Sequence, residues 1–463
     1  MTKSITEQLA ERMSEMSFDS LTKEVIEEAK YRLLDIIAVT VPAWEREKSA
    51  QIARDYAQIY GAGLEQATLM KVGTRVTAPM AAFANGVAGH SLELDDDHNT
   101  MVGHPGIPVV PAVIAAAERA NASGRDLILG TIIGYDVVIR TAQAVKAGVL
   151  HHTGFHPTGT NGVFGATAGV SKIMGLDVPT TVNALGIAGS QSSGLIQAVN
   201  EGVMTKRFHA GWAAHNGVTA ATLAQMGFTA PREVLEGAHG WYHAYAGEGT
   251  YDLDIILKDW GTLYEIENTA WKPYACNRYS HGPIDCAFDI RRQLDGKVDV
   301  NEIESIEVGT YQEALEFTAG PEKVVPRNTF DAQFSTYFAV AVSMLTGRAL
   351  LDEFSEEKIA DPEVLALAKK VTVVADPELQ PLYPKLYPAR IIMTMRDGRI
   401  LKAMVRTPKG DPEWTLTRDE LLERFRTLAG RVYANDQVEE IISVVTSLEE
   451  LERVPDLLAL LAR

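Results

Sequence analysis

N-G-V-A-G-H-S-L-E-L-D-D-D-H-N-T-M-V-G-H-P-G-I-P-V-V-P, residues 85–111, is the stretch around which this chain is organised. Ala-, Val- and Gly-rich segments lie on both sides of its ionisable side chains. Such groups are costly to bury unless they are paired, hydrated or used. An acidic run alone is typical of a solvated loop, but imidazole beside carboxylate is what proton transfer near neutral pH requires. The stretch therefore predicts one wall of an active site, with these ionisable residues: His90, Glu93, Asp95, Asp96, Asp97, His98 and His104.

Outward from this stretch, the sequence has the periodicity of helices. Residues 24–41 place apolar side chains at helical spacing, 79–90 form a small-residue helix, and 126–149 are a nearly unbroken apolar segment. Because these segments are apolar on several faces and rich in Ala and Gly, they predict layers of closely packed helices. The expected fold class is mainly α.

The pattern changes near residue 269. Alternating segments at 302–311, 369–375, 390–395 and 400–405 predict strands, and Asp397-Gly398 is a strong hairpin signal. Helices are expected at 331–346 and 362–368. Helical patterns resume beyond Pro408, where Thr417 and Glu420 form a capping-box sequence. We therefore expect a large helical domain built from residues 1–268 and 405–463, with an inserted α+β lid domain at 269–404.

Composition excludes several classes of function. The 463 residues carry a net charge of −18, which argues against non-specific binding to nucleic acid or to an anionic membrane. The first residues lack the apolar run of a signal peptide, and no segment is apolar enough to span a bilayer. Cys276 and Cys286 are too few for a disulfide framework. A cytoplasmic protein is expected.

Two glycine-rich segments mimic other motifs. Residues 151–165 lack the G-x-G-x-x-G spacing and the preceding strand of a dinucleotide loop, and 181–200 do not contain G-x-S-x-G.

Residues 204–217, M-T-K-R-F-H-A-G-W-A-A-H-N-G, gather four basic or imidazole groups in an otherwise acidic chain. Lying between Gly/Ala-rich helices, this group predicts an anion site.

Six motifs in a fixed order over some 330 residues resemble the MmgE/PrpD family. They are N-G-x-x-x-H-S-L-E-L-D-D with H-P-G, G-F-H-P-T-G with G-x-x-G, K-R-F-H-A-G-W-A-A-H-N-G, K-P-Y-A-C-x-x-x-x-H-G-P-I-D, A-Q-F-S-T-Y-F-A-x-A and T-P-K-G-D-P. The resemblance implies a helical domain from both chain ends, a smaller α+β lid, a homodimer, and an active site between the domains that needs no metal or organic cofactor.

When the family's functional residues are carried over to the matching motif positions, the resemblance implies a catalytic group of His104, His156, Lys206 and His281. The expected substrate-binding residues are Glu93, Asp96, Asp97, His98, Arg207, Lys272 and Tyr279. Glu93 stands where relatives such as cis-aconitate decarboxylase carry Asp, and Asp97 where they carry Thr. These departures lie in the substrate-contacting loop and put the identity of the substrate in question.

The family's reactions share a carbanion next to a carboxylate. Lys206, with Arg207 nearby, can hold carboxylates and spread the developing charge. His104 or His156 suits the role of base, and His281 that of an acid toward a departing hydroxyl. Acidic neighbours can orient these imidazoles or raise their pKa. The sequence does not tell which histidine does which.

The expected function is that of a lyase without a cofactor, either the dehydratase of a 2-methylcitrate-like substrate or the decarboxylase of a cis-aconitate-like one. An epimerase of a substituted succinate such as iminodisuccinate is the alternative. A metal-dependent hydrolase using His90, Asp96, His98 and His104 is a weaker alternative, because no H-E-x-x-H motif is present. A binding protein without catalysis is weaker still, since separate segments supply complementary acids and bases.

Overall fold

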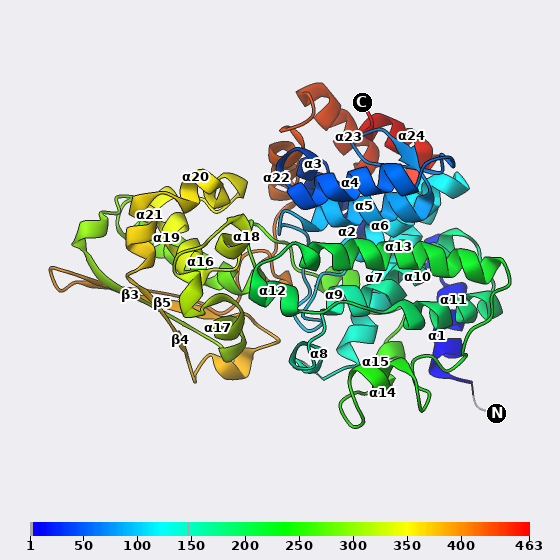
Figure 1. Cartoon of the computed structure of the whole chain (residues 1–463), viewed down its shortest axis with the longest axis horizontal. Coiled ribbons are helices and arrows are strands. Elements are labelled where there is room, and N and C mark those ends of the chain that lie inside the picture. Colours follow the sequence, from blue (N-terminus) through cyan, green and yellow to red (C-terminus); the bar gives the residue numbers. More distant parts are fainter. Residues whose placement is uncertain (1–2, 147) are drawn as a thin grey trace.

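The computed structural model describes residues 3–146 and 148–463, and most of its elements are helices (Figure 1). We call the helices on the right of Figure 1 the helical part. They are α1 (Ile5–Glu15), α2 (Lys23–Thr40), α3 (Ala43–Arg46), α4 (Lys48–Tyr60), α5 (Ala78–His90), α6 (Gly106–Ala120), α7 (Gly124–Gln143), α8 (Val149–His152), α9 (Pro157–Thr160), α10 (Gly162–Ile173), α11 (Val178–Gln191), α12 (Gln197–Glu201), α13 (Thr205–Gln225), α14 (Trp241–Tyr245), α15 (Asp254–Leu257), α22 (Arg418–Ala429), α23 (Asn435–Thr446) and α24 (Val454–Leu461).

The α+β part lies beside it, on the left of Figure 1. It contains β3 (Ile303–Thr310), β4 (Val371–Ala375), β5 (Ala389–Met395) and β6 (Ile400–Val405), with α16 (His281–Gln293), α17 (Gln312–Thr318), α18 (Thr329–Gln333), α19 (Thr336–Thr346), α20 (Glu356–Ile359) and α21 (Pro362–Ala368).

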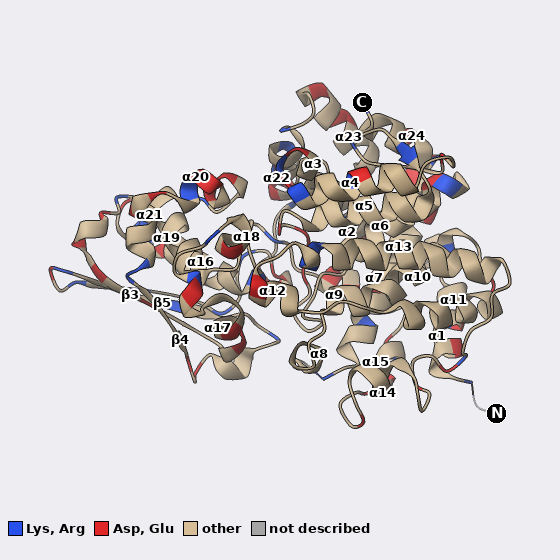
Figure 2. Cartoon of the chain, in the orientation of Figure 1, with Lys and Arg blue, Asp and Glu red and all other residues tan. Residues whose placement is uncertain are grey.

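The core of the helical part is formed by α5, α6, α7, α10 and α13, which pack on one another. Helix α5 carries no Lys, Arg, Asp or Glu, and its ribbon is tan along its whole length in Figure 2. Nearly all of its side chains are buried. The mainly α fold class expected from the apolar, small-residue segments is confirmed.

Glycine lets α5 and α13 approach closely at one point. A Cβ added to Gly86 would lie 2.8 Å from Cα of Gly211, so neither position has room for a side chain. His90 lies four residues after the first glycine and Lys206 five residues before the second. The end of α5 therefore meets the start of α13, and His90 and Lys206 are in contact.

The sheet of the α+β part has the strand order β4-β3-β5-β6. Strands β3 and β4 run parallel, whereas β3–β5 and β5–β6 are antiparallel, with Arg390 opposite Met404 in the last pair. The Asp397-Gly398 hairpin joins β5 to β6 as predicted, and Gly398 takes a φ of 88°. Helix α16 packs on β5 and β6, and α19 on β4.

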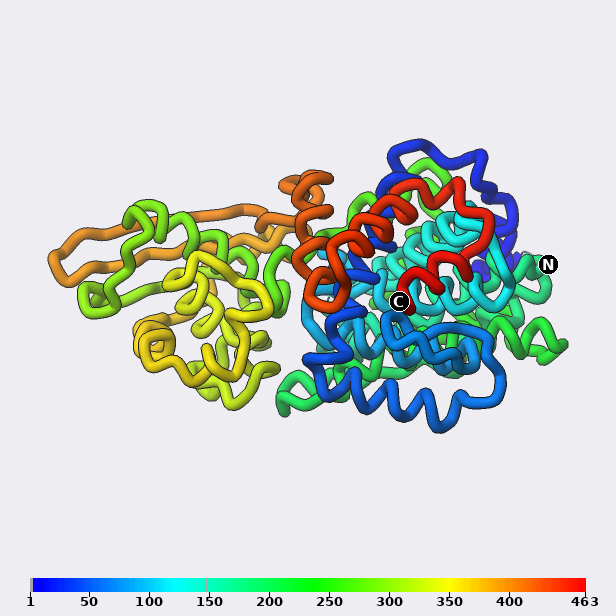
Figure 3. The backbone as a smooth tube through the Cα atoms, turned by 90° about the horizontal axis from the view of Figure 1, so that it is seen from above, coloured from blue at the N-terminus to red at the C-terminus, as the bar shows by residue number. Residues whose placement is uncertain are grey.

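The chain returns to the helical part after β6. Helices α22 and α23 pack against α2, and Figure 3 shows the C-terminal helices (orange to red) beside the N-terminal ones (blue). The Thr417–Glu420 capping box at the start of α22 is confirmed. The domain boundaries at 268/269 and 404/405 stay a prediction.

Local structure departs from the sequence pattern in three places. The helix expected over 126–149 ends at Gln143, because the backbone next pairs with residues 250–251. The helix expected over 331–346 is split into α18 and α19, where Ser335 caps the second. A short antiparallel pair, β1 (Ala67–Thr68) with β2 (Arg75–Val76), was not predicted. Among the described residues, no helix is long and apolar enough to cross a membrane.

Candidate active site

A cavity opens where the 97–104 loop meets the 277–279 segment. Its walls come from both parts of the molecule. The lining residues are Asp97, Val102, Gly103, His104, His151, His156, Ile196, Val199, Lys206, Asn277, Arg278, Tyr279, Phe317, Phe334 and Tyr387. Five of the predicted site residues are therefore brought together here: Asp97, His104, His156, Lys206 and Tyr279.

His104 is held through its Nδ1 atom. This nitrogen lies 2.7 Å from the backbone oxygen of Asp96, 3.5 Å from Oδ2 of Asp95 and 3.6 Å from Oδ2 of Asp97. A carbonyl oxygen only accepts, so Nδ1 carries the hydrogen, and the Nε2 lone pair is left free. The acidic run thus surrounds one edge of the ring, and an imidazolium formed on His104 would have three acceptors beside it.

Lys206 lies in a chain of buried polar contacts. Its Nζ is 2.7 Å from Oε1 of Glu93 and 3.1 Å from Nε2 of His90. Nδ1 of His90 is 2.8 Å from Oδ2 of Asp95. An ammonium group only donates, so Nε2 of His90 accepts, and Nδ1 donates to the Asp95 carboxylate. The third ammonium hydrogen of Lys206 remains for the cavity.

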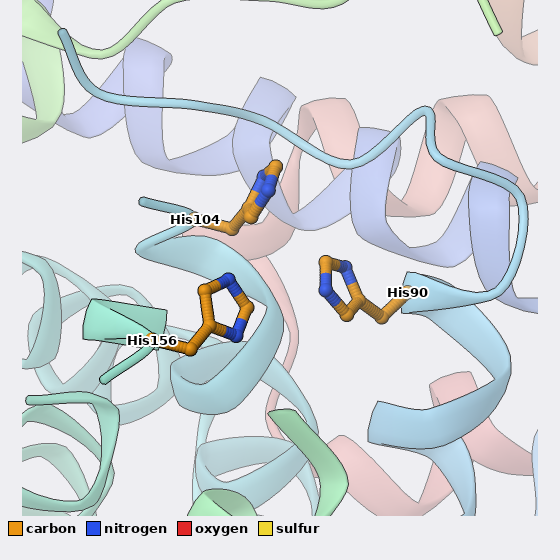
Figure 4. Close-up of side chains that lie close together, drawn as sticks. All are labelled: His90, His104 and His156. Atoms are coloured by element: carbon orange, nitrogen blue, oxygen red, sulfur yellow. The ribbon is translucent and has the colours of Figure 1, made fainter. Parts of the chain in front are cut away.

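Burial decides the protonation states of the histidines. It lowers the pKa of His90, and it lowers the pKa of His104 and His156 well below the ordinary value, so all three are neutral at pH 7. Figure 4 shows their side chains converging from separate segments. The ring centroids of His90 and His104 are 4.8 Å apart. Nδ1 of His156 also lies 3.2 Å from Nδ1 of His209.

Two ammonium groups share one carboxylate. Burial alone would raise the pKa of Glu93, but Lys206 and Lys272 outweigh it and hold that pKa below its usual range. Nζ of Lys272 lies 3.6 Å from Oε2 of Glu93 and is fully buried. Burial lowers the pKa of Lys206, while the charge of Glu93 opposes this. Glu93 thus contacts two cations at once, and of these Lys206 also lines the cavity, where it can meet an anionic ligand.

Arg278 supplies a second cation to the cavity. Its guanidinium is ion-paired with Asp411 through Nη2, and Nη1 lies 3.0 Å from Nδ1 of His281. Its Nε atom has no hydrogen-bond partner among the residues that the structure describes. His281 is buried behind Arg278 and is not among the residues that line the cavity. Its Nε2 atom lies 3.3 Å from the carbonyl oxygen of Cys276. The Tyr387 ring faces the guanidinium at 5.8 Å.

The other predicted residues face away from the cavity. Asp96 accepts from Gly106 N at 3.0 Å and from the Tyr135 hydroxyl at 2.6 Å, so its side chain anchors the start of α6. His98 contacts Glu265 at 3.5 Å. Arg207 donates to the carbonyl oxygen of Ser91 at 3.2 Å. Asp96 and Arg207 thus bind backbone atoms next to the cavity and fix the position of the loop that carries the site residues.

The sequence placed His90 and Asp95 in the predicted wall of the active site but gave Asp95 no specific role and His90 only that of a metal ligand, and it did not point to Arg278. All three stand inside the family motifs, in N-G-x-x-x-H-S-L-E-L-D-D and K-P-Y-A-C-x-x-x-x-H-G-P-I-D, where Arg278 occupies an unspecified position. Their place inside these motifs was the sequence signal that could have pointed to them. A motif does not tell which of its side chains turns toward the cavity.

The loop is held in an uncommon conformation at two of its residues. Glu93 has a φ of 54° and Val102 a φ of 53°, in the left-handed region that non-glycine residues seldom adopt. Such conformations cost of order 1–3 kcal/mol and cluster at functional sites. The ion pairs of Glu93 supply the contacts that maintain the first.

The three histidines fit a metal ion poorly. One nitrogen from each of His90, His104 and His156 lies within 4.8 Å of the others. Tetrahedral zinc, with Zn–N of about 2.0–2.1 Å, needs nitrogens roughly 3.3–3.4 Å apart. Both nitrogens of His90 are already engaged, and the Lys206 ammonium would repel a cation. Asp96 and His98, the other ligands of the hydrolase alternative, point elsewhere.

Comparison with known proteins gives a consistent result. Residues 7–254 match the MmgE/PrpD N-terminal domain, and residues 274–450 match the MmgE/PrpD C-terminal domain. The chain is 30% identical over 480 residues to cis-aconitate decarboxylase of Aspergillus terreus, covering 99% of this chain and 96% of that protein. It is 29% identical over 457 residues to human cis-aconitate decarboxylase (98% and 93%). It is 25% identical over 364 residues to mitochondrial 2-methylcitrate dehydratase of Yarrowia lipolytica (74% and 68%).

Proposed function

The chain belongs to the MmgE/PrpD family, and we propose that its reaction passes through a carbanion next to a carboxylate of a tricarboxylate-like substrate. The relatives are a decarboxylase and a dehydratase by name, and this chain is a lyase of the same family. Loss of CO₂ and loss of water can both pass through such a carbanion.

The free Nε2 of His104 is the observation that carries this proposal. Its Nδ1 hydrogen is committed to the Asp96 carbonyl oxygen at 2.7 Å, so the lone pair on Nε2 is available to a C–H bond in the cavity. Asp95 and Asp97 lie near Nδ1 and stabilise the imidazolium that forms. His104 is therefore the base of the proposed reaction, and His156 lines the cavity beside it.

Two cations hold the carboxylates of the substrate. Lys206 has one ammonium hydrogen left for the cavity, and the Arg278 side chain lines the same cavity. Preorganised positive charge at the carboxylate next to the carbanion is stronger in a buried site than in water. Lys272 does not line the cavity, but its positive charge lies behind Glu93 and adds to that of Lys206.

The reaction type is tested by NMR in D₂O with 2-methylcitrate, citrate, cis-aconitate and substituted succinates. We expect deuterium at the carbon next to a carboxylate, together with product. His104→Asn keeps an N–H donor toward Asp96 and should lose about 10²–10⁴-fold in rate. His243→Asn, an exposed histidine in α14, should match the wild type. Wild-type activity in His104→Asn would contradict the proposal.

No step of this proposal uses a metal or an organic cofactor. Treatment with a chelator should therefore leave turnover unchanged, with metal content measured before and after. Loss of activity that returns on adding one divalent metal would favour the hydrolase alternative. Inversion at a carbon of a substituted succinate, without loss of water or CO₂, would favour the epimerase.

A further inference from the structure

Asp97 is the one carboxylate that lines the cavity in the part of the chain that the structure describes. The backbone of Asp97 is fixed, because it exchanges two hydrogen bonds with Ala270, at 3.1 and 2.7 Å. Asp97 is 5% exposed, its Oδ2 atom lies 3.6 Å from Nδ1 of His104, and no hydrogen bond to its side chain is found among the described residues. Its carboxyl oxygens are therefore available to a ligand in the cavity or to a proton.

A carboxylate at this position is unfavourable for an enzyme that binds polycarboxylates. The charged groups around it are Lys272 and Arg278, which attract its negative charge, and Asp95 and Asp411, which repel it. Burial raises the pKa of Asp97 to about 7, against the attraction of the two cations. An anionic substrate would favour the protonated form further.

We propose that Asp97 is the acid that protonates a departing hydroxyl, and that the reaction is the dehydration of a hydroxy-polycarboxylate. This rests on the proposed function and decides between its two lyase reactions. Decarboxylation of an unsaturated substrate has no leaving hydroxyl to protonate; there a cavity-facing carboxyl would instead protonate the carbanion left by the loss of CO₂, and the experiment below separates the two outcomes.

The step balances with the groups present. His104 Nε2 takes the hydrogen from the carbon next to a carboxylate, and the electron pair of that C–H bond forms the double bond. The C–O bond on the adjacent carbon breaks, and its oxygen leaves as water with the Asp97 proton. The products on the enzyme are an imidazolium and a carboxylate, whose Nδ1 and Oδ2 atoms lie 3.6 Å apart. The elimination thus forms an ion pair rather than two isolated charges.

The test separates proton abstraction from loss of water. Wild type is incubated with 2-methylcitrate or citrate in D₂O, and deuterium uptake and water loss are followed by NMR. Asp97→Asn should keep the deuterium uptake, which needs only His104, within a few-fold, while dehydration falls at least about 100-fold. His104→Asn should lose both, and Asp97→Glu, which restores an acid, should recover part of the dehydration.

Circular dichroism of each variant shows that the fold is kept. Dehydration by Asp97→Asn at the wild-type rate would overturn the inference. So would a wild type that decarboxylates cis-aconitate but dehydrates neither hydroxy acid. If no polycarboxylate exchanges hydrogen or turns over, the proposed function itself fails and the inference falls with it.

Discussion

The guanidinium of Arg424, in the C-terminal helix α22, donates to the backbone oxygen of Leu94 at 2.7 Å. The same group donates to the backbone oxygen of Lys272 at 2.8 Å and to Oδ1 of Asp35 at 2.7 Å. One side chain therefore joins the acidic stretch, the Lys272 segment and helix α2. Arg424 therefore fixes the relative position of the Leu94 and Lys272 segments. Both segments supply site residues, and they lie about 180 positions apart in the sequence.

Replacing Arg424 should affect stability and activity by different routes. Arg424→Met leaves the buried Asp35 carboxylate uncompensated, which should cost about 3–5 kcal/mol in the free energy of unfolding, measured with urea. The double variant Arg424→Met/Asp35→Asn should regain much of that stability. Its turnover should stay roughly 100-fold low, because Leu94 and Lys272 are no longer aligned. Full recovery of turnover would show that Arg424 only stabilises the fold.

Glu93 should set the alkaline limit of proton abstraction, the step that does not use the Asp97 proton. The proposed reaction needs Lys206 protonated, and burial lowers its pKa while the Glu93 charge opposes this. Glu93→Gln removes that charge, so the pKa of Lys206 falls further and the protonated form is lost at a lower pH. The basic limb of the pH profile of deuterium uptake, which does not use the Asp97 proton, should therefore move to lower pH. A uniform fall in rate without this movement would contradict the assignment, and the exposed Glu439→Gln serves as the control.

The glycine contact between α5 and α13 should be intolerant of a methyl group. A Cβ on Gly211 would lie 2.4 Å from the Phe83 carbonyl oxygen, so the two helices must move apart. Gly211→Ala should lose about 1–3 kcal/mol of stability. It should also lower kcat, because His90 and Lys206 separate. Gln225→Ala, at the exposed end of the same helix, should change neither value.

We propose that the protein is a homodimer and that a second copy covers an apolar groove between α4, α5 and α13. Ile52, Tyr56 and Phe208 are 51%, 41% and 39% exposed there, and the Phe83, Phe208 and Trp212 rings pack together. Exposed apolar patches of this kind mark interfaces, and two-fold dimers are the commonest soluble oligomers. Light scattering at micromolar concentration should give twice the chain mass.

The variant Ile52→Glu should shift the dimer to the monomer, since it places a charge in the groove. Met404→Glu makes the same change at an exposed apolar residue of β6 and should leave the mass unchanged. A wild-type protein that is monomeric and fully active would contradict the dimer.

The sequence by itself determined the main helices, the strands of the α+β part and the motifs. Helical periodicity, the alternation of β5 and the Asp397-Gly398 turn are local properties, so the mainly α class and the β5–β6 hairpin could be predicted without tertiary contacts. The order of the motifs likewise pointed to the family.

Only the tertiary structure decided which charged side chains face the substrate cavity. Lys206 lines it, whereas Arg207 turns to Ser91, because successive residues of a helix point about 100° apart. Arg278 stands in front of His281, and the Asp97 side chain faces the cavity while that of Asp96 binds Gly106 and Tyr135. The orientations of Lys206 and Arg278 depend on partners more than a hundred residues away, Glu93 and Asp411, which no local pattern specifies.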